Sequence, residues 1–483
     1  MRRALVLMMA AGLSLAAFAV EFKAGYAAAD ITPPLGCDMP GYYIVRNAKE
    51  VLDPLEIVCV AFSDGKTTAL VMQVDSETVV DDVVRRMKEA ITAATGVEAD
   101  AILIHGSHTH DGGPLMIRDS AMRTKEDNAR AKRLAEIYVN LAVTRAADAA
   151  VSAIRDLKPA KLSCARTQAK RISFGRRYLM KDGKVKTNPG VKNPDIVKPV
   201  GNPPDEEEQV VRIDREGGEA IAIINFQTHP DVVGGEFITA DWPGLTRRVF
   251  AAATMGRAKC IVFNGTQGDV NHVNVMPLPG EENGLHHDFD DVDRGYDHAL
   301  HMANVLAGNA LAVWMKCVPM EAGEIRCGSL KVRVPSQRAK DTDEKNLAWA
   351  EKVVAMHDAG KDAELPWKGM ELTTEVARAC RIKRLANGPE AFDLPLTGIA
   401  IGQSLAFGGF PGEPFNDIGK AVKQGSPFKM TILSCLTNGS RGYFPFSDSY
   451  KEGGYESATS SFGPTVADDL IAGQLQLLNS LYR

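Results

Sequence analysis

The chain has 483 residues, of which 45% are hydrophobic and 24% are charged, as in an ordinary globular enzyme. It carries 56 Lys and Arg residues against 61 Asp and Glu residues, so its formal net charge is −5. Because a basic surplus is the usual mark of nucleic-acid binding, we expect no nucleic acid partner. The length allows one large domain or two to three smaller ones.

The first 19 residues have the pattern of a secretory signal peptide. Met1-Arg-Arg supplies the positive charge, residues 4–17 form a short apolar run, and Ala17-Phe18-Ala19 offers the small residues that a signal peptidase reads. The apolar run is too short for a lasting membrane anchor. We therefore expect cleavage after Ala19 and a secreted or periplasmic protein.

Strand-like and helix-like segments alternate along the rest of the chain. This alternation predicts an α/β fold, and short turns such as Asp64-Gly65 favour a mixed sheet flanked by helices. Residues 181–205, rich in Lys, Pro and Asn, are expected to form a surface loop near a site. The predicted strands are 55–62, 67–74, 101–104, 161–165, 209–213, 220–226, 259–263, 329–334, 398–401, 404–407 and 430–434. The predicted helices are 81–95, 127–157, 244–253, 293–315, 344–357, 413–423 and 465–481.

The eight cysteines do not have the pattern of a disulfide scaffold. Cys59, Cys260 and Cys435 lie inside apolar runs, where a free thiol behaves as a small hydrophobe. A chain of this size also needs no disulfide bonds to fold. A bridge between Cys317 and Cys327 remains open.

A histidine-rich motif follows the strand predicted at 101–104. The motif is His105-Gly-Ser-His-Thr-His-Asp-Gly-Gly, and it holds three of the ten histidines in the chain. In an extended segment, His108 and His110 would point the same way and could reach one small object. Imidazole is the commonest metal ligand and the usual base near neutral pH, so the motif predicts a metal or proton-transfer site. The alternative is a polar turn that happens to carry histidine.

Four more predicted strands end in polar loops with unusual side chains. In open α/β sheets, ligands bind outside the carboxyl ends of strands, so these loops are expected to converge. Nitrogen and oxygen donors without thiolates suit a catalytic Zn²⁺. Each loop also has a plainer explanation: a turn at Pro230, a helix cap at Glu413, or core packing of Tyr443. The loops carry Gln227-Thr-His229-Pro230, Asn264-Gly-Thr-Gln-Gly-Asp269-Val-Asn271-His272, Gly408-Gly-Phe-Pro-Gly-Glu413-Pro414 and Asn438-Gly-Ser-Arg-Gly-Tyr443.

The ordered set of motifs resembles the neutral (alkaline, non-lysosomal) ceramidases, which are zinc amidases that cleave the N-acyl bond of ceramide. The resemblance covers nearly the whole mature chain and implies a single catalytic domain at 20–483, without the additional C-terminal β domain of members that act on ceramide. It rests on Ala24-Gly-Tyr-Ala-Ala-Ala-Asp-Ile-Thr-Pro-Pro, Ser107-His-Thr-His-Asp-Gly, Gly175-Arg-Arg, Thr228-His-Pro, Gln267-Gly-Asp-Val, Pro411-Gly-Glu, Asn438-Gly-Ser-Arg-Gly-Tyr and Tyr455-Glu-Ser-Ala-Thr-Ser-Ser-Phe-Gly-Pro.

The resemblance implies a role for each matching residue. The implied zinc ligands are His108, His229, Glu413 and Tyr443. His110 matches a histidine that handles the attacking water or a proton, and Tyr455 matches a donor to the oxyanion. Arg176 matches an arginine near the scissile carbonyl, although Arg177 fits the register equally well. Asp241 and Asp269 are expected either to orient a ligand imidazole or to cap their loops.

One position departs from the family. The ceramidases carry a serine in Gly-Asp-Val-Ser, proposed as a nucleophile or water-positioning group, whereas this chain has Asn271. An amide cannot attack a carbonyl, so we expect hydrolysis by metal-bound hydroxide, with Asn271 at most binding substrate. His272 beside it is expected to be an acid/base group or a lining residue.

The sequence therefore predicts an exported Zn²⁺-dependent hydrolase of an N-acyl bond in a small-molecule or lipid-like substrate. Peripheral contact with a membrane is compatible with this prediction. One alternative is a zinc esterase or other hydrolase of a small polar or sugar-linked substrate, and another is a catalytically silent binding protein. Residues 286–291 (His-His-Asp-Phe-Asp-Asp) are expected to form a solvated acidic turn rather than a metal site. His298 and His301 are expected at a helix surface or between helices.

Overall fold

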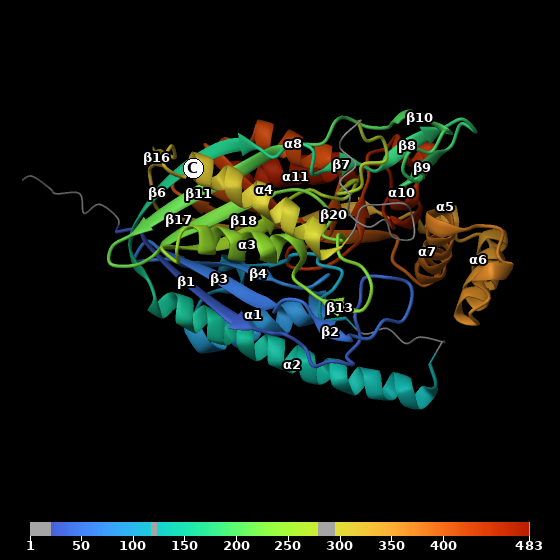
Figure 1. Ribbon diagram of the computed structural model, residues 1–483, viewed down its shortest axis with the longest axis horizontal. Helices are drawn as coiled ribbons and strands as arrows, with labels where there is room; N and C mark the ends of the chain where they lie inside the picture. The colour runs from blue at the N-terminus through green and yellow to red at the C-terminus, as the bar shows by residue number, and fades with distance from the viewer. Residues whose placement is uncertain (1–20, 117–122, 279–294, 483) are drawn as a thin grey trace, which may run out of the picture.

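The computed structural model describes residues 21–116, 123–278 and 295–482. The predicted signal peptide and the predicted acidic turn at 286–291 lie outside the described residues. The described chain is a mixed α/β fold in which helices cover the faces of two sheets, as the alternation of strands and helices predicted (Figure 1).

The larger sheet has nine strands and mixed pairing. Its order is β14-β12-β11-β6-β1-β3-β4-β5, with β16 beside β6. The β4–β5 and β12–β14 pairs are parallel, and the other pairs are antiparallel. The strands are β1 (Lys23–Asp30), β3 (Glu56–Ser63), β4 (Thr68–Val74), β5 (Ile102–Gly106), β6 (Lys158–Gln168), β11 (Glu207–Arg215), β12 (Ala220–Phe226), β14 (Ala258–Asn264) and β16 (Val318–Met320).

The smaller sheet has four strands, and short pairs of strands surround it. Its order is β17 (Ile325–Pro335), β18 (Ala391–Ile401), β19 (Leu405–Gly409) and β21 (Met430–Ser434), with β19 and β21 parallel. Three two-stranded pairs are β2 (Glu50–Val51) with β13 (Phe237–Ile238), β7 (Phe174–Gly175) with β15 (Val270–Asn271), and β20 (Glu413–Pro414) with β22 (Tyr443–Phe444). A three-stranded sheet joins β8 (Arg177–Met180), β9 (Val185–Thr187) and β10 (Ile196–Pro199).

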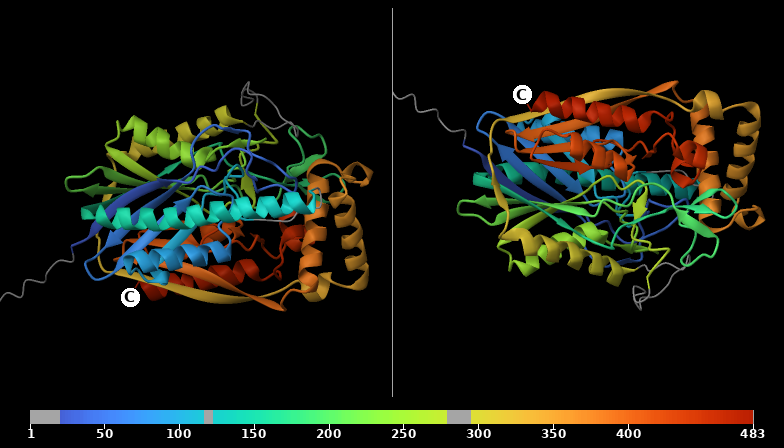
Figure 2. Two further views of the ribbon diagram at one scale, coloured as in Figure 1. Left: turned by 90° about the horizontal axis from the view of Figure 1, so that it is seen from below. Right: turned by 90° about the horizontal axis from the view of Figure 1, so that it is seen from above.

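Helices enclose the sheets on several sides (Figures 1 and 2). Helices α1 (Asp81–Thr95) and α2 (Lys125–Arg155) lie side by side, and α2 packs on β1 and β3. Helices α3 (Asp241–Ala253) and α4 (Tyr296–Trp314) form a second layer, with α3 against β14. Helices α8 (Asn416–Gly425) and α11 (Val466–Leu481) cover the smaller sheet. At one end, α6 (Glu344–Asp358) and α7 (Gly369–Ala386) form a hairpin beside the short helices α5 (Arg338–Asp341), α9 (Ser449–Glu452) and α10 (Tyr455–Thr459).

The spacing of apolar residues explains why the outer helices form where they do. In α1, Val83, Val84, Met87 and Ile91 recur at helical spacing and are buried, and the helix ends at Gly96, whose φ of 74° suits glycine. Burial of each such side chain stabilises the fold by about 1.5–3 kcal/mol. Helix α2 is long and apolar enough by composition to cross a membrane, yet its buried alanine stripe packs on β1 and β3. One face of α2 is therefore buried against the sheet, while the opposite face is exposed.

Several sequence-based expectations differ from the structure, and β1 was not among the predicted strands. Residues 181–205 are not one irregular loop, because they contain β9 and β10. The helix predicted from Glu413 begins at Asn416, since Glu413 and Pro414 instead pair in parallel with Tyr443 and Phe444. Helix α7 was not predicted at all. The eight cysteines are all free, and no bridge joins Cys317 to Cys327.

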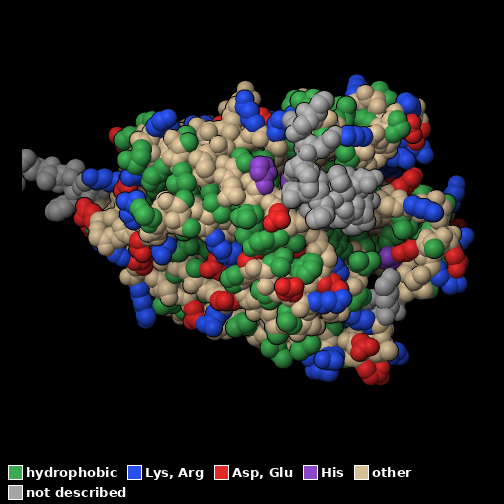
Figure 3. All heavy atoms as spheres, in the orientation of Figure 1, with side chains coloured by type: hydrophobic (Ala, Val, Ile, Leu, Met, Phe, Trp, Pro, Cys, Tyr) green, Lys and Arg blue, Asp and Glu red, His purple; other side chains and the backbone are tan. Residues whose placement is uncertain are grey.

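Charged side chains are interspersed over the face shown in Figure 3. Lys and Arg alternate with Asp and Glu, and the described residues on that face form no continuous basic stripe. The distribution agrees with the nearly balanced composition of the chain.

Candidate metal centre

Four strand ends bring the predicted ligands to one place. His108 follows β5, and His229 follows β12 of the same sheet. Glu413 lies on β20 just after β19, and Tyr443 lies on β22 after β21, so these two come from the smaller sheet. Glu413 and Tyr443 are direct partners in the β20–β22 pair. The junction of the two sheets therefore builds the site.

The backbone around each residue is fixed by local hydrogen bonds. His108 has a φ of 73°, a left-handed conformation that is uncommon outside glycine, and its N–H donates to Ser76 O at 2.9 Å. The prediction that His108 and His110 lie in an extended segment is therefore wrong. The strand ends at Gly106, and a turn directs the two imidazoles. The N–H of His229 donates to Val270 O at 3.2 Å, and that of Glu413 donates to Gly442 O at 2.9 Å.

Three donor atoms lie at the spacing of a tetrahedral metal site. His108 Nε2 is 3.2 Å from His229 Nε2 and 3.4 Å from Glu413 Oε2, and His229 Nε2 is 3.3 Å from the same oxygen. Ligands at 2.0–2.1 Å from a tetrahedral zinc ion are separated by about 3.3 Å. Tyr443 Oη is 3.5 Å from His229 Nε2, and His110 Nε2 is 3.4 Å from His108 Nε2.

Backbone carbonyls set the orientation of both ligand imidazoles. His108 Nδ1 lies 2.7 Å from Glu77 O, and His229 Nδ1 lies 3.1 Å from Gln267 O. A carbonyl can only accept, so each Nδ1 carries the hydrogen and each Nε2 lone pair faces the centre. Two lone pairs and a carboxylate oxygen that face one another repel unless a cation or a proton lies between them. The donor set therefore fits a metal ion with nitrogen and oxygen ligands.

The electrostatics also indicate that a positive charge belongs at the centre. Burial lowers the pKa of His108, but the carboxylates of Glu413 and Glu77 outweigh it and raise this pKa to about 9. Burial and the nearby Arg176 hold the pKa of His229 well below its ordinary value. Burial raises the pKa of Glu413, but His108 and Arg176 outweigh it, so the net shift is downward. A proton on His108 thus takes the place that a cation would occupy.

His110 faces the same cluster from the rim. The side-chain nitrogens of His108, His110 and His229 lie within 4.8 Å of one another. His110 Nδ1 is 3.9 Å from Asp231 Oδ1, which also accepts a hydrogen bond from the Tyr42 hydroxyl. Burial lowers the pKa of His110 to about 3, so its imidazole is neutral. It can supply either a further nitrogen ligand or a proton acceptor.

The side chains of Arg176 and Arg177 point to different parts of the structure. Arg176 donates from Nη2 to Gly268 O at 2.6 Å, and its guanidinium carbon is 5.5 Å from the centroid of the Tyr443 ring. Arg177 instead donates to Ser449 Oγ at 2.9 Å and to Glu452 Oε2 at 3.1 Å, both on α9. Arg176 is therefore the arginine beside the candidate metal centre.

Tyr455 and Asn271 lie near the site in different ways. The Tyr455 ring is 5.6 Å from the Tyr443 ring, and burial keeps its pKa well above the ordinary value, so its hydroxyl remains a donor. Asn271 is engaged at both ends of its amide: Nδ2 donates to Asn188 Oδ1 at 3.0 Å, and Oδ1 accepts from Val273 N at 3.0 Å. Asn271 therefore clamps its own loop.

The two candidate orienting carboxylates hold backbone rather than imidazoles. Asp241 accepts from the N–H groups of Val232 and Val233, at 2.9 and 3.2 Å. Asp269 Oδ1 accepts from Asn416 N at 2.7 Å, at the start of α8. Of the two roles expected for them, loop capping is the one observed.

The remaining histidines have other positions. His105 is fully buried, its Nδ1 lies 2.7 Å from Cys435 O, and its Nε2 accepts from Asn264 N at 3.1 Å. It therefore joins β5 to the neighbouring strand ends as a structural residue. His272 lies 5.7 Å from His298, which lies 6.0 Å from His301, as centroid distances.

Three contributors were not expected from the sequence. Gln267 accepts from His229 through its backbone and donates from Nε2 to Glu413 Oε2 at 3.3 Å. Glu456 accepts a hydrogen bond from Arg176, and Tyr43 is among the groups that raise the pKa of Tyr455. Gln267 and Glu456 both stand inside the quoted motifs, but their contacts join segments far apart in the chain, and no local pattern signals them.

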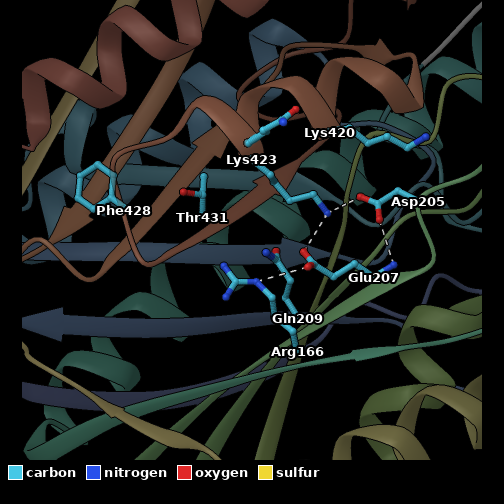
Figure 4. Close-up of a pocket in the computed structure, with 9 residues that line it drawn as sticks. Arg166, Asp205, Glu207, Gln209, Lys420, Lys423, Phe428 and Thr431 are labelled. Carbon is cyan, nitrogen blue, oxygen red and sulfur yellow. Dashed lines mark hydrogen bonds and ion pairs between the residues drawn. The ribbon is translucent and has the colours of Figure 1, made fainter.

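A separate polar pocket of 270 Å³ lies between β6 and β11 on one side and α8 and β21 on the other (Figure 4). Lys423 bridges Asp205 at 2.5 Å and Glu207 at 3.4 Å, and Arg166 also lies 3.4 Å from Glu207. These ion pairs hold residues 203–207 against α8, so the charged side chains that line the pocket have a structural role.

Comparison with known proteins identifies the fold. No protein-family model and no curated protein matches the sequence. The structure is similar to that of a neutral ceramidase from Pseudomonas aeruginosa, with a TM-score of 0.65 and 16% identity over 96% of this chain and 75% of that one. A ceramidase complexed with C2 gives a TM-score of 0.64 and 15% identity over 96% and 76% of the two chains. The chain therefore has a neutral-ceramidase-like fold.

Proposed function

We propose that this chain is an exported, zinc-dependent hydrolase that cleaves an N-acyl (amide) bond. The observation that carries the proposal is the set of three donor atoms from His108, His229 and Glu413, which are 3.2–3.4 Å apart. The ceramidase-like fold supports it, since the similar structures are named for enzymes that act on an N-acyl lipid. Export rests on the signal-peptide pattern of residues 1–19.

The donor set would hold zinc through His108, His229 and Glu413, with Tyr443 beside them. When bound, zinc lowers the pKa of a coordinated water toward neutrality and polarises a carbonyl group. His110, neutral and aimed at the cluster, takes the proton from the attacking water at Nε2 and returns it to the leaving amine.

Arg176 and Tyr455 are the hydrogen-bond donors for the carbonyl oxygen of the substrate. Arg176 and the protonated hydroxyl of Tyr455 lie on the Tyr443 side of the cluster, where they can donate to the developing negative charge. Asn271 does not act as a nucleophile, because its amide cannot attack and is already bonded to Asn188 and Val273. The attack on the carbonyl is accordingly made by water.

A substrate panel tests the proposal and its rivals. Zinc-loaded protein is incubated with matched N-acyl and O-acyl compounds, including short- and long-chain ceramides, and the products are identified. We expect release of the acyl group from an amide, lost in His229→Ala. Cleavage of esters alone would favour the esterase, and absence of any turnover in folded, zinc-loaded protein would favour a silent binding protein.

A further inference from the structure

A buried carboxylate outside the predicted site holds the arginine beside it. Glu456 lies on α10 with none of its surface exposed. Its Oε1 accepts from Arg176 Nε at 2.7 Å, and its Oε2 accepts from Thr187 Oγ1 at 2.9 Å. The same Oε2 is 3.7 Å from Arg177 Nε. One carboxylate therefore serves two consecutive arginines.

The two arginines do not depend on Glu456 equally. Arg176 is 5% exposed and Arg177 is 3% exposed, so each guanidinium needs a partner to offset the cost of its burial. Arg177 has a second carboxylate, Glu452, at 3.1 Å. Within the described residues, Glu456 is the one carboxylate at ion-pair distance from Arg176. Loss of the charge on Glu456 would thus release Arg176 more than Arg177.

Arg176 in turn contacts Tyr443 directly and is linked to the Glu413 segment through Gly268. Its guanidinium carbon lies 5.5 Å from the centroid of the Tyr443 ring. Its Nη2 donates to Gly268 O, and Gly268 N donates to Pro414 O at 2.9 Å, next to Glu413. The end of α10 adds a further tie, because Ser460 Oγ donates to Tyr443 O at 3.0 Å.

We propose that Glu456 is a positioning residue of the candidate metal centre, acting through Arg176 to hold Tyr443 and the Glu413 segment against His229. The inference rests on the proposed function, since it requires the centre to bind metal. Glu456 touches neither metal nor substrate. Its effect is to fix the direction of the Arg176 guanidinium and to neutralise it, so that Tyr443 Oη keeps its place 3.5 Å from His229 Nε2.

The test compares Glu456→Gln with a matched control, Glu452→Gln, which removes a carboxylate from Arg177 alone. Cobalt(II) replaces zinc as the probe, because its visible absorption reports ligand geometry, and zinc affinity is measured by competition with a chelator. We expect Glu456→Gln to bind zinc about 10–100-fold more weakly and to change the cobalt spectrum. Glu452→Gln should match the wild type in both.

A purely structural role gives a different result. If Glu456→Gln lowers the melting temperature but leaves zinc affinity and the cobalt spectrum unchanged, the inference is overturned while the proposed function stands. If the wild type binds neither metal, both are overturned. Glu456→Asp keeps the negative charge on a shorter side chain, and it replaces Glu456→Gln in the test if the Gln variant does not fold. It should show an intermediate loss of affinity, and a wild-type spectrum and affinity in Glu456→Asp would likewise overturn the inference.

Discussion

Gly268 offers a sharp test of how tightly the Glu413 segment is placed. A Cβ at this position would lie 2.6 Å from Glu413 O and 2.9 Å from Pro414 O, both of which are backbone atoms. Ordinary contacts begin at 3.4 Å, so Gly268→Ala requires a displacement of about 0.8 Å. Metal-ligand distances tolerate only about 0.2 Å. The substitution should therefore move Glu413 out of register with His108 and His229.

We expect Gly268→Ala to destabilise the protein by about 1–3 kcal/mol, as overpacking does, and to weaken zinc binding by about 10–100-fold. Zinc affinity is measured by chelator competition, and stability is measured by calorimetry of the metal-free protein. The control is Gly308→Ala on the exposed side of α4, where no atom lies within 4 Å of the new Cβ. That variant should bind zinc normally and gain up to about 1 kcal/mol. Wild-type zinc affinity in Gly268→Ala would refute the placement of Glu413.

Three further predictions concern residues around the site and the core. His105→Ala should lose about 1–3 kcal/mol of stability with its two hydrogen bonds but keep the zinc stoichiometry of the wild type; metal loss would contradict its structural role. Burial raises the pKa of Glu208 on β11 to about 8, so the folded state holds this proton more tightly than the unfolded state. Stability should then fall as pH rises from about 4.5 through about 8. Glu208→Gln should reduce this loss of unfolding free energy between pH 5 and pH 8.5, as measured by urea titration. An equal loss in the variant and the wild type would count against the prediction. Tyr43 helps to raise the pKa of Tyr455, so kcat for amide cleavage should drop about tenfold in Tyr43→Phe with little change in KM. An increase in KM alone would point to substrate binding instead.

Much of the fold could be predicted from periodicity. Helix α1 spans the predicted residues 81–95, and β12 spans the predicted 220–226, because their apolar residues follow one clear period. Helix α7 escaped prediction because Ala377, Ala379 and Arg381 interrupt its buried face, which weakens the apolar period. β9 and β10 escaped because Lys and Pro dominate a segment that pairs only locally.

The candidate site was predictable as a set of strand ends but not as a geometry. The rule that ligands gather at the carboxyl ends of strands placed His108, His229, Glu413 and Tyr443 together. The left-handed turn at His108 could not be predicted, since it depends on its bond to Ser76 O. The supporting residues were equally hidden, because a contact such as that between Arg176 and Glu456 spans 280 positions.

The central claim is that the side chains of His108, His229 and Glu413 bind one metal ion. The most direct test is anomalous X-ray diffraction at the zinc absorption edge on crystals of the zinc-incubated protein. We expect a single strong peak about 2.0–2.2 Å from Nε2 of both histidines and from an oxygen of Glu413. A fully folded, zinc-saturated crystal with no peak between these three side chains would contradict it.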